Sequence, residues 1–135
     1  MDSQNPTYRP HENEPYMSQR QTEYFRRHLL QWRDLVLRQT LNCRSELNRE
    51  RDESGDIIDR SVELMSQRLA LLNNQRAQLL VERINAALAR IEAGRYGYCL
   101  HTGEEIGLQR LLAWPIATLS IEAQEALERR HRLPA

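Results

Sequence analysis

The fold depends on residues 47–56, which read LNRERDESGD. Six of these ten residues are charged, and Gly55 can adopt the backbone conformations that a chain reversal needs. Helix-like apolar patterns stand on both sides, so the stretch predicts a polar turn between two helices. Two helices of similar length joined by a short turn form an antiparallel hairpin.

The helix before the turn is predicted to begin near Ser18, because serine is favoured at helix N-termini. Its seam positions are spaced 4, 3, 4, 3 and 4 residues apart, which is the spacing of a coiled coil. They are Phe25, Leu29, Trp32, Val36, Gln39 and Cys43. The helix after the turn is predicted to begin at about Asp56 and to end near Ala93, with Gly94 closing it.

A second seam, with spacings of 3, 4, 3, 4, 3 and 4, follows the turn. Its members are Val62, Met65, Leu69, Leu72, Arg76, Leu79 and Arg83. From about Leu80 the apolar stripe moves to Ile84, Leu88 and Ile91, as at a coiled-coil stutter. Each arm is about 50 Å long at about 1.5 Å per residue. A two-helix seam leaves most of such an arm exposed to solvent. One explanation for a long exposed arm is that it reaches into a partner protein.

Two segments flank the hairpin, which we place at residues 18–93 with its tip near 52–61. Residues 1–17 are polar and hold three of the five prolines, which predicts a flexible tail tied down near Tyr16. Residues 94–135 are predicted to form a small globular module with a C-terminal helix.

Within this module we expect a short β pair around Ile106–Ala113, and a last helix over about 120–131 that begins at Thr118 or Ser120. We expect the base of the hairpin to pack on the module. The residues expected in that contact are Phe25, Leu29, Trp32 and Ile91.

Composition narrows the possible functions. The 19 basic residues are all arginine and balance 19 acidic ones, whereas a chain that binds DNA directly usually carries a basic excess. The arginine bias alone is equally explained by genomic base composition. Cys43 and Cys99 lie far apart, which favours a reducing compartment over a disulfide framework. Without a signal peptide or an apolar run of about 20 residues, we expect a cytoplasmic protein.

Asp56 and Asp59 stand one helical turn apart, so their carboxylates share a face. One interpretation is local, because aspartate is favoured at the start of a helix as an N-cap and by the helix dipole. The other is contact with a partner. Spacing alone leaves both open.

Three motifs, in order along residues 15–131, resemble the DksA/TraR family. PYMSQRQTEYFRRHLLQWRDLV (15–36) resembles the segment before its coiled coil, and DIIDRS (56–61) resembles its tip motif D-x-x-D-x-A. GRYGYCLHTGEEIGLQRLLAWPIATLSIEAQ (94–124) resembles its zinc-finger signature. The resemblance implies a transcription regulator that binds RNA polymerase rather than promoter DNA. Such proteins insert the coiled-coil tip into the secondary channel and act in the stringent response with guanosine tetraphosphate (ppGpp).

Carried onto this sequence, the resemblance places Asp56, Asp59 and Ser61 at the polymerase active centre, with Ser61 where the family has alanine. Both interpretations of the aspartate pair can then hold together. The family's basic ppGpp contacts fall on Arg83, Trp114 and Gln124, where it typically has Lys, Arg and Lys. One basic residue is kept and two are replaced, so we expect a weakened ppGpp response.

The family's four zinc thiolates fall on Cys99, Thr102, Ser120 and Ala123. A structural zinc site needs four nitrogen or sulfur donors, so we predict a degenerate finger without zinc. A Cys99/His101 pair with two borrowed ligands is the alternative. We expect the hydroxyls of Thr102 and Ser120 to bond to each other or to nearby backbone.

Packing must then replace the metal. The apolar residues available for it are Leu100, Ile106, Leu108, Leu111, Leu112, Trp114, Leu119 and Ile121. Cys99 is either a small buried apolar group or a redox-sensitive thiol. A zinc-independent paralogue would keep working during zinc starvation; a decayed finger without adaptive use is the alternative.

The sequence thus predicts a mainly α protein: a long antiparallel coiled-coil hairpin, a small zinc-finger-like module and a C-terminal helix. We do not expect an enzyme, because the sequence lacks a nucleophile–base pair and a phosphate-binding loop. A Gre-like transcript-cleavage or elongation factor and a self-associating structural coiled coil are the alternatives. Arg76 and Arg83 in the seam argue against a tight dimer, so we expect a monomer.

Overall fold

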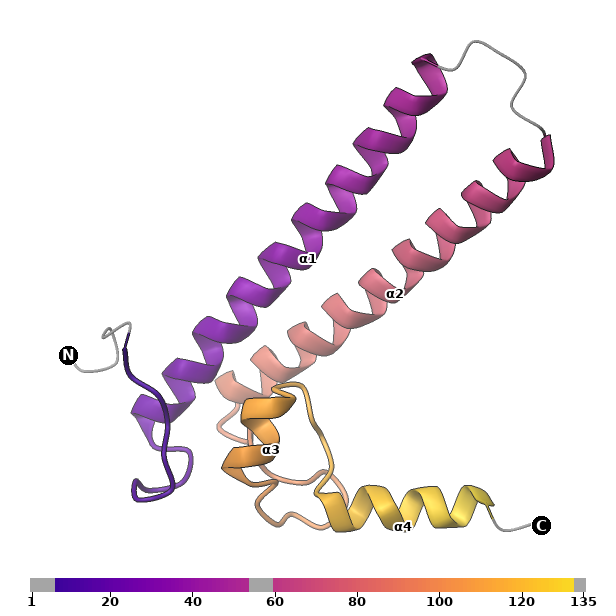
Figure 1. Cartoon of the computed structure of the whole chain (residues 1–135). Helices are drawn as coiled ribbons and strands as arrows, with labels where there is room; N and C mark the ends of the chain where they lie inside the picture. Colours follow the sequence, from indigo (N-terminus) through magenta and orange to yellow (C-terminus); the bar gives the residue numbers. More distant parts are fainter. Residues whose placement is uncertain (1–6, 54–59, 133–135) are drawn as a thin grey trace. The chain divides into compact units, whose positions relative to one another are not determined.

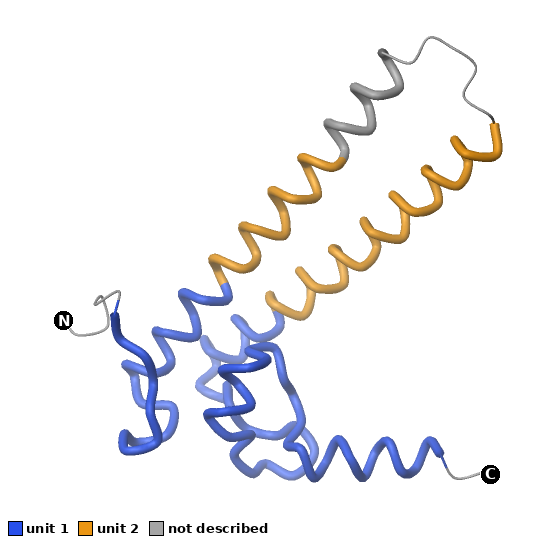
Figure 2. The backbone as a smooth tube through the Cα atoms, in the orientation of Figure 1, with its two compact units in different colours: residues 1–29, 86–135 blue, residues 30–85 orange. Residues whose placement is uncertain are grey.

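A computed structural model describes residues 7–53 and 60–132, and the side chains of these residues except 44–53. It contains the helices α1 (Gln19–Glu53), α2 (Arg60–Glu92), α3 (Leu108–Ala113) and α4 (Ile121–Arg132) (Figure 1). The predicted mainly α class with a long helical hairpin is confirmed. The chain divides into two compact units, and the boundaries between them fall inside the two long helices. Leu30–Asn85 form one unit, and Met1–Leu29 with Ala86–Ala135 form the other (Figure 2).

Two helix ends follow their predicted signals. The Ser18 hydroxyl accepts the Gln21 N–H at 3.3 Å at the start of α1, as an N-cap does. At the end of α2, Gly94 has a φ of +72°, and the next N–H, that of Arg95, returns to the Arg90 carbonyl at 2.9 Å. The predicted beginning of α2 near Asp56 lies outside the described residues.

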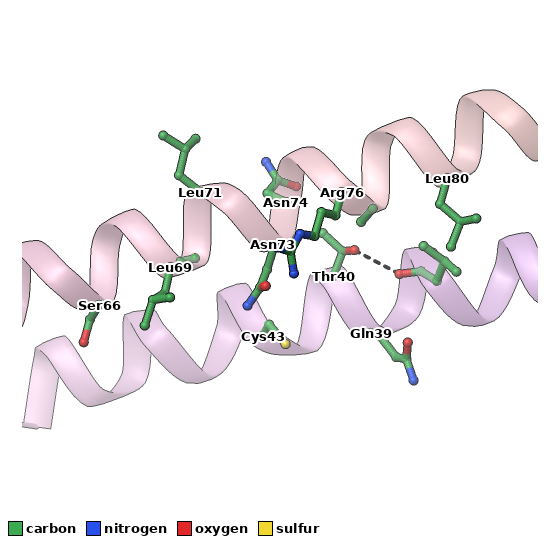
Figure 3. A pocket seen from close by; sticks show the side chains of 13 residues that line it. Gln39, Thr40, Cys43, Ser66, Leu69, Leu71, Asn73, Asn74, Arg76 and Leu80 are labelled. Atoms are coloured by element: carbon green, nitrogen blue, oxygen red, sulfur yellow. Dashed lines mark hydrogen bonds between the residues drawn. The ribbon is translucent and has the colours of Figure 1, made fainter. Parts of the chain in front are cut away.

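Within the unit Leu30–Asn85, α1 and α2 lie side by side, and Arg33 Nη1 donates to Asn85 Oδ1 at 2.7 Å. The more buried stripe of α2 recurs every three or four residues. Its members here are Ala70, Asn74, Ala77, Val81 and Ile84. A groove of about 790 Å³ runs between the two helices, lined in part by Val36, Leu69 and Ala77 (Figure 3).

The predicted seam of α2 is wrong between residues 62 and 83. Its apolar members are 47–66% exposed, and both of its arginines are exposed. Those apolar members are Val62, Met65, Leu69, Leu72 and Leu79. The stripe with small residues, Ala70 and Ala77, is the more buried one instead. The continuation through Ile84, Leu88 and Ile91 is buried or half-buried, as predicted.

The seam of α1 is confirmed at its beginning. Phe25 and Leu29 are fully buried, Val36 is buried and Trp32 is half-buried. Gln39 and Cys43, at the far end of the predicted seam, are exposed.

The N-terminal segment is more ordered than a flexible tail from residue 7 onward. Pro10 is buried, and the Arg20 guanidinium lies 3.7 Å from the centroid of the Tyr8 ring. The Tyr8 hydroxyl donates to Glu14, which also accepts from Arg20. Gln21, 1% exposed, donates to the His11 carbonyl. These contacts hold the segment against the first turns of α1.

The core of the module is built partly from the predicted residues. Ile106, Leu108 and Leu111 are buried, whereas Leu112 and Leu119 are half-buried. Leu100, Trp114 and Ile121 are 64%, 47% and 51% exposed, so they contribute little core. Further buried members are Tyr96, Ile116 and Ala117. The Phe25 and Tyr96 rings pack with centroids 5.6 Å apart, which gives the expected contact between the base of α1 and the module.

The predicted β pair at Ile106–Ala113 is wrong, because helix α3 occupies Leu108–Ala113. An isolated antiparallel bridge instead joins Tyr98 and Glu105. The pattern LQRLLA has the apolar spacing of a short helix, since Leu108 and Leu111 lie on one face and are both buried. In the part of the chain that the structure describes, no helix is both long and apolar enough to cross a membrane.

Candidate functional site

A tight loop carries the first two of the four zinc-finger positions. We call residues 97–107 the knuckle. The Cys99 N–H donates to the Glu104 carbonyl at 2.7 Å, and the Ile106 N–H donates to the Gly97 carbonyl at 2.8 Å. Gly103, at a φ of +74°, returns its N–H to the Cys99 carbonyl at 2.9 Å. These bonds present Cys99 and Thr102 at the closed end of the knuckle.

Cys99 is the chemically distinctive group of the site. Its side chain is 3% exposed, and burial alone raises the pKa of the thiol. The Thr102 hydroxyl and the backbone N–H groups of Ser120, Thr102 and His101 lie close enough to the sulfur to lower its pKa as hydrogen-bond donors. Because these donors favour the charged form, they outweigh burial and lower the pKa of Cys99 to about 6. A pKa near 6 means that these donors favour the thiolate form of Cys99 at neutral pH.

The second pair of positions stands at the start of α4. The Leu100 N–H donates to the Thr118 carbonyl at 2.9 Å, which brings the segment before α4 to the knuckle. The buried Ser120 caps α4, because its hydroxyl accepts the Ala123 N–H at 3.2 Å. The backbone N–H of Ser120 thus lies toward the Cys99 sulfur, while its hydroxyl caps α4. The expected cap of the last helix is confirmed.

These donors do not fit a tetrahedral zinc ion. Thr102 and Ser120 offer neutral hydroxyls that are already engaged, with the Glu104 N–H and the Ala123 N–H respectively. Ala123 has no donor atom, and His101 is exposed. Across the described ranges, no three His, Cys, Asp or Glu side chains gather as a metal site would require. Structural zinc takes four strong nitrogen or sulfur donors, and this site offers a single thiolate, that of Cys99.

We expect Cys99 to titrate near pH 6. In a Cys43→Ser variant, which leaves Cys99 as the one thiol, the rate of alkylation by iodoacetamide should rise with a midpoint near pH 6. A free thiol titrates near about 8.5. Since the fold stabilises the thiolate, the contribution of Cys99 to the free energy of unfolding is complete above about pH 8.5 and is lost as the pH falls through about 6.

The control for this titration is a Thr102→Val variant in the same background. It removes the side-chain hydrogen bond to the sulfur and should move the midpoint upward. A midpoint near about 8.5 before that change would contradict the hydrogen-bonded thiolate.

The three positions of the expected ppGpp contacts belong to different units. Arg83 is exposed on α2 in the unit Leu30–Asn85, whereas Trp114 and Gln124 belong to the other unit. Gln124 is already engaged, because it accepts from Arg110 and donates to Glu128 at 3.3 Å. The Arg110 guanidinium also donates to the Leu119 carbonyl at 2.9 Å, so it braces α3 against the start of α4.

Arg110 was not among the residues singled out from the sequence. It lies in EIGLQRL (105–111), inside the stretch that resembles the family's zinc-finger signature.

Of the three tip residues predicted to act at the polymerase, the structure describes only Ser61. Asp56 and Asp59 lie outside the described residues, and Ser61 is exposed in the first turn of α2. Their shared role therefore stays a prediction.

Comparison with known proteins extends over both the hairpin and the module. Residues 21–91 match the family described as DnaK suppressor protein DksA, N-terminal domain, and residues 94–129 match the prokaryotic dksA/traR C4-type zinc finger. The RNA polymerase-binding transcription factor DksA of Caulobacter vibrioides (strain NA1000 / CB15N) is 46% identical, over 93% of this chain and 89% of that protein. The protein of the same name from Escherichia coli (strain K12) is 31% identical, over 93% of this chain and 83% of that protein.

The solved structure of transcription factor DksA2 from Pseudomonas aeruginosa is also similar. It is 33% identical, covers 90% of this chain and 95% of its own, and superposes with a TM-score of 0.71. The likeness therefore includes both the long helices and the finger module. The chain belongs to the DksA/TraR family.

Proposed function

We propose that this chain is a zinc-independent regulator that binds bacterial RNA polymerase and modulates transcription initiation from the secondary channel, as part of the stringent response. The observation that carries the proposal is the similarity over the whole architecture: the 0.71 TM-score extends over 90% of the chain. The curated relatives named above are RNA polymerase-binding transcription factors, which supports the choice of partner. The equal numbers of basic and acidic residues support binding to a protein rather than to DNA.

In this proposal the hairpin delivers the tip to the polymerase active centre. Asp56 and Asp59 supply negative charge there, and Ser61, in place of the family's alanine, adjusts the strength of the effect. The chain acts as a cytoplasmic monomer, and it reaches promoters through the polymerase.

Independence from zinc is the finer part of the proposal. The matched finger family is of the C4 type, but of the four ligand positions this chain keeps Cys99 alone. Zinc contributes on the order of 10–16 kcal/mol to the folding of isolated fingers. Here the buried residues Ile106, Leu108 and Leu111 and the hydrogen bonds around Cys99 support a module that folds without it. Such a protein would maintain regulation during zinc starvation.

Metal analysis and polymerase binding test the proposal together. Purified chain should contain well under one zinc per molecule. After treatment with a zinc-selective chelator and desalting, it should bind polymerase and alter initiation as before, because no donor set requires the metal. A DksA relative with all four thiolates is the control and should lose activity. Stoichiometric zinc, or failure to bind polymerase, would refute the proposal.

We expect a weakened response to ppGpp. Trp114 and Gln124 replace basic residues, and each lost phosphate contact should weaken ppGpp binding by about 1–3 kcal/mol, the size of a charged hydrogen bond. In vitro transcription with and without ppGpp measures the response. Potentiation equal to that of a zinc-bearing DksA would contradict the expectation.

A further inference from the structure

The first and last residues of the knuckle, which form its open end, are joined by Tyr16, a residue outside the module. The Tyr16 hydroxyl donates to the Gly97 carbonyl at 2.6 Å and accepts the Gly107 N–H at 3.1 Å. Gly97 and Gly107 are the two ends of the knuckle, and they lie 81 and 91 residues from Tyr16 in sequence. A tyrosine hydroxyl can donate and accept at once, so this one group joins both ends of the knuckle.

The contact is close and fitted to this sequence. Gly97 has a φ of +93°, and a Cβ built on it would lie 2.8 Å from Met17 Cγ and 3.1 Å from the Tyr16 hydroxyl. Glycine therefore lets residues 16 and 17 approach the knuckle backbone. The Tyr16 ring also packs edge to face on Tyr98, with centroids 5.8 Å apart. Burial of the hydroxyl raises the pKa of Tyr16, so the group keeps its proton at neutral pH.

Tyr16 is itself held in place by α1. We call residues 14–18 the strap. The Met17 N–H donates to Gln21 Oε1 at 2.9 Å, and Ser18 caps the helix. At the other end, Glu14 accepts from Arg20 at 3.4 Å and from Gln21 at 3.3 Å. The strap is thus fixed to the first turn of α1 and presents Tyr16 to the knuckle.

We propose that the strap holds the two ends of the knuckle together from outside the module, with the Tyr16 hydroxyl as the clip, and that this contact helps the loop keep its shape without a metal. In a zinc finger, a metal bound to four ligands joins the knuckle to the rest of the module. Here the ligand positions do not fit zinc, and a covalently continuous part of the same chain joins the two ends of the loop. The inference rests on the proposed independence from zinc. It predicts that the knuckle opens when the strap is released, while the long helices stay folded.

Amide hydrogen exchange of the full chain tests the clip. In Tyr16→Phe, the amides of Cys99, Ile106 and Gly107 should exchange about tenfold to hundredfold faster, as expected for the loss of two hydrogen bonds. Amides in the middle of α2 should be unchanged. Tyr24→Phe is the matched control, because it removes a hydroxyl from an α1 tyrosine whose ring packs on Phe25 and His28 instead.

Metal content measured on the same samples separates the two proposals. Faster exchange in Tyr16→Phe but not in Tyr24→Phe, in zinc-free protein, supports the clip. Equal exchange in both variants of zinc-free protein overturns the clip and leaves the proposed function standing. Stoichiometric zinc in the wild type overturns the independence from zinc, and the clip with it.

A second measurement covers the case in which Tyr16→Phe does not fold. In wild-type protein under low urea, amides of the strap and of the knuckle should become exposed together, with the same dependence on urea. Separate opening of the two segments would overturn the inference.

Discussion

An Asp59→Asn variant should bind RNA polymerase with nearly unchanged affinity and lose most of its effect on initiation. Asparagine keeps the size and hydrogen-bonding shape of the side chain but removes its charge. If the tip acts by charge at the active centre, each lost charged contact removes about 1.5–3 kcal/mol, which is roughly tenfold or more in effect. A binding assay with labelled chain and in vitro transcription from a responsive promoter measure the two properties separately.

Asp34→Asn is the matched control for this variant. Asp34 is 60% exposed on α1 and pairs with Arg38 at 2.9 Å, one helical turn away. Exposed pairs of this kind contribute little, so binding and activity should both be unchanged. Full activity of Asp59→Asn would eliminate the proposed tip mechanism. Loss of binding would show that Asp59 anchors the chain rather than acting at the active centre.

The ends of the helices could be predicted from the sequence because their signals are local. The Ser18 hydroxyl accepts the Gln21 N–H at the start of α1, and Gly94 supplies the positive φ that ends α2. Neither depends on distant parts of the chain. The same holds for Ser120 at the start of α4.

The seam of α2 could not be predicted, because its spacing fits more than one stripe. Leu71 and Leu72, and likewise Leu79 and Leu80, are adjacent, so several faces of α2 look apolar. The heptad spacing favours Leu69 and Leu72, which the structure leaves about half exposed. Contacts with α1 decide which face of α2 is buried, and the spacing of apolar residues within α2 does not identify that face.

The candidate site was predictable in part. The order of Cys99, Thr102, Ser120 and Ala123 in the motif indicated that they belong together, and the structure brings the Cys99 sulfur to Thr102 and to the Ser120 backbone. The strap was not foreseen beyond an anchor near Tyr16. Its contacts join residues 81 and 91 positions apart, and a polar, proline-containing segment gives no periodic signal of such pairing.

A Phe25→Ala variant should destabilise the module by about 3–5 kcal/mol, the usual cost of truncating a buried phenylalanine. Phe25 is 1% exposed and packs on Tyr96 and on Tyr24, with ring centroids 5.6 and 5.4 Å away. A loss of that size is a large part of the roughly 5–15 kcal/mol that stabilises a typical domain.

The Leu111 amide measures this loss, because Leu111 is fully buried in the module and its N–H is bonded to the Gly107 carbonyl at 3.1 Å. Its exchange rate in Phe25→Ala should rise by roughly two to four powers of ten. Leu100→Ala is the control: Leu100 lies in the same module but is 64% exposed, so its truncation should change stability by less than about 0.5 kcal/mol. Equal effects of the two variants would mean that α1 does not support the module. In that case packing at the base of the hairpin could not stand in for a metal.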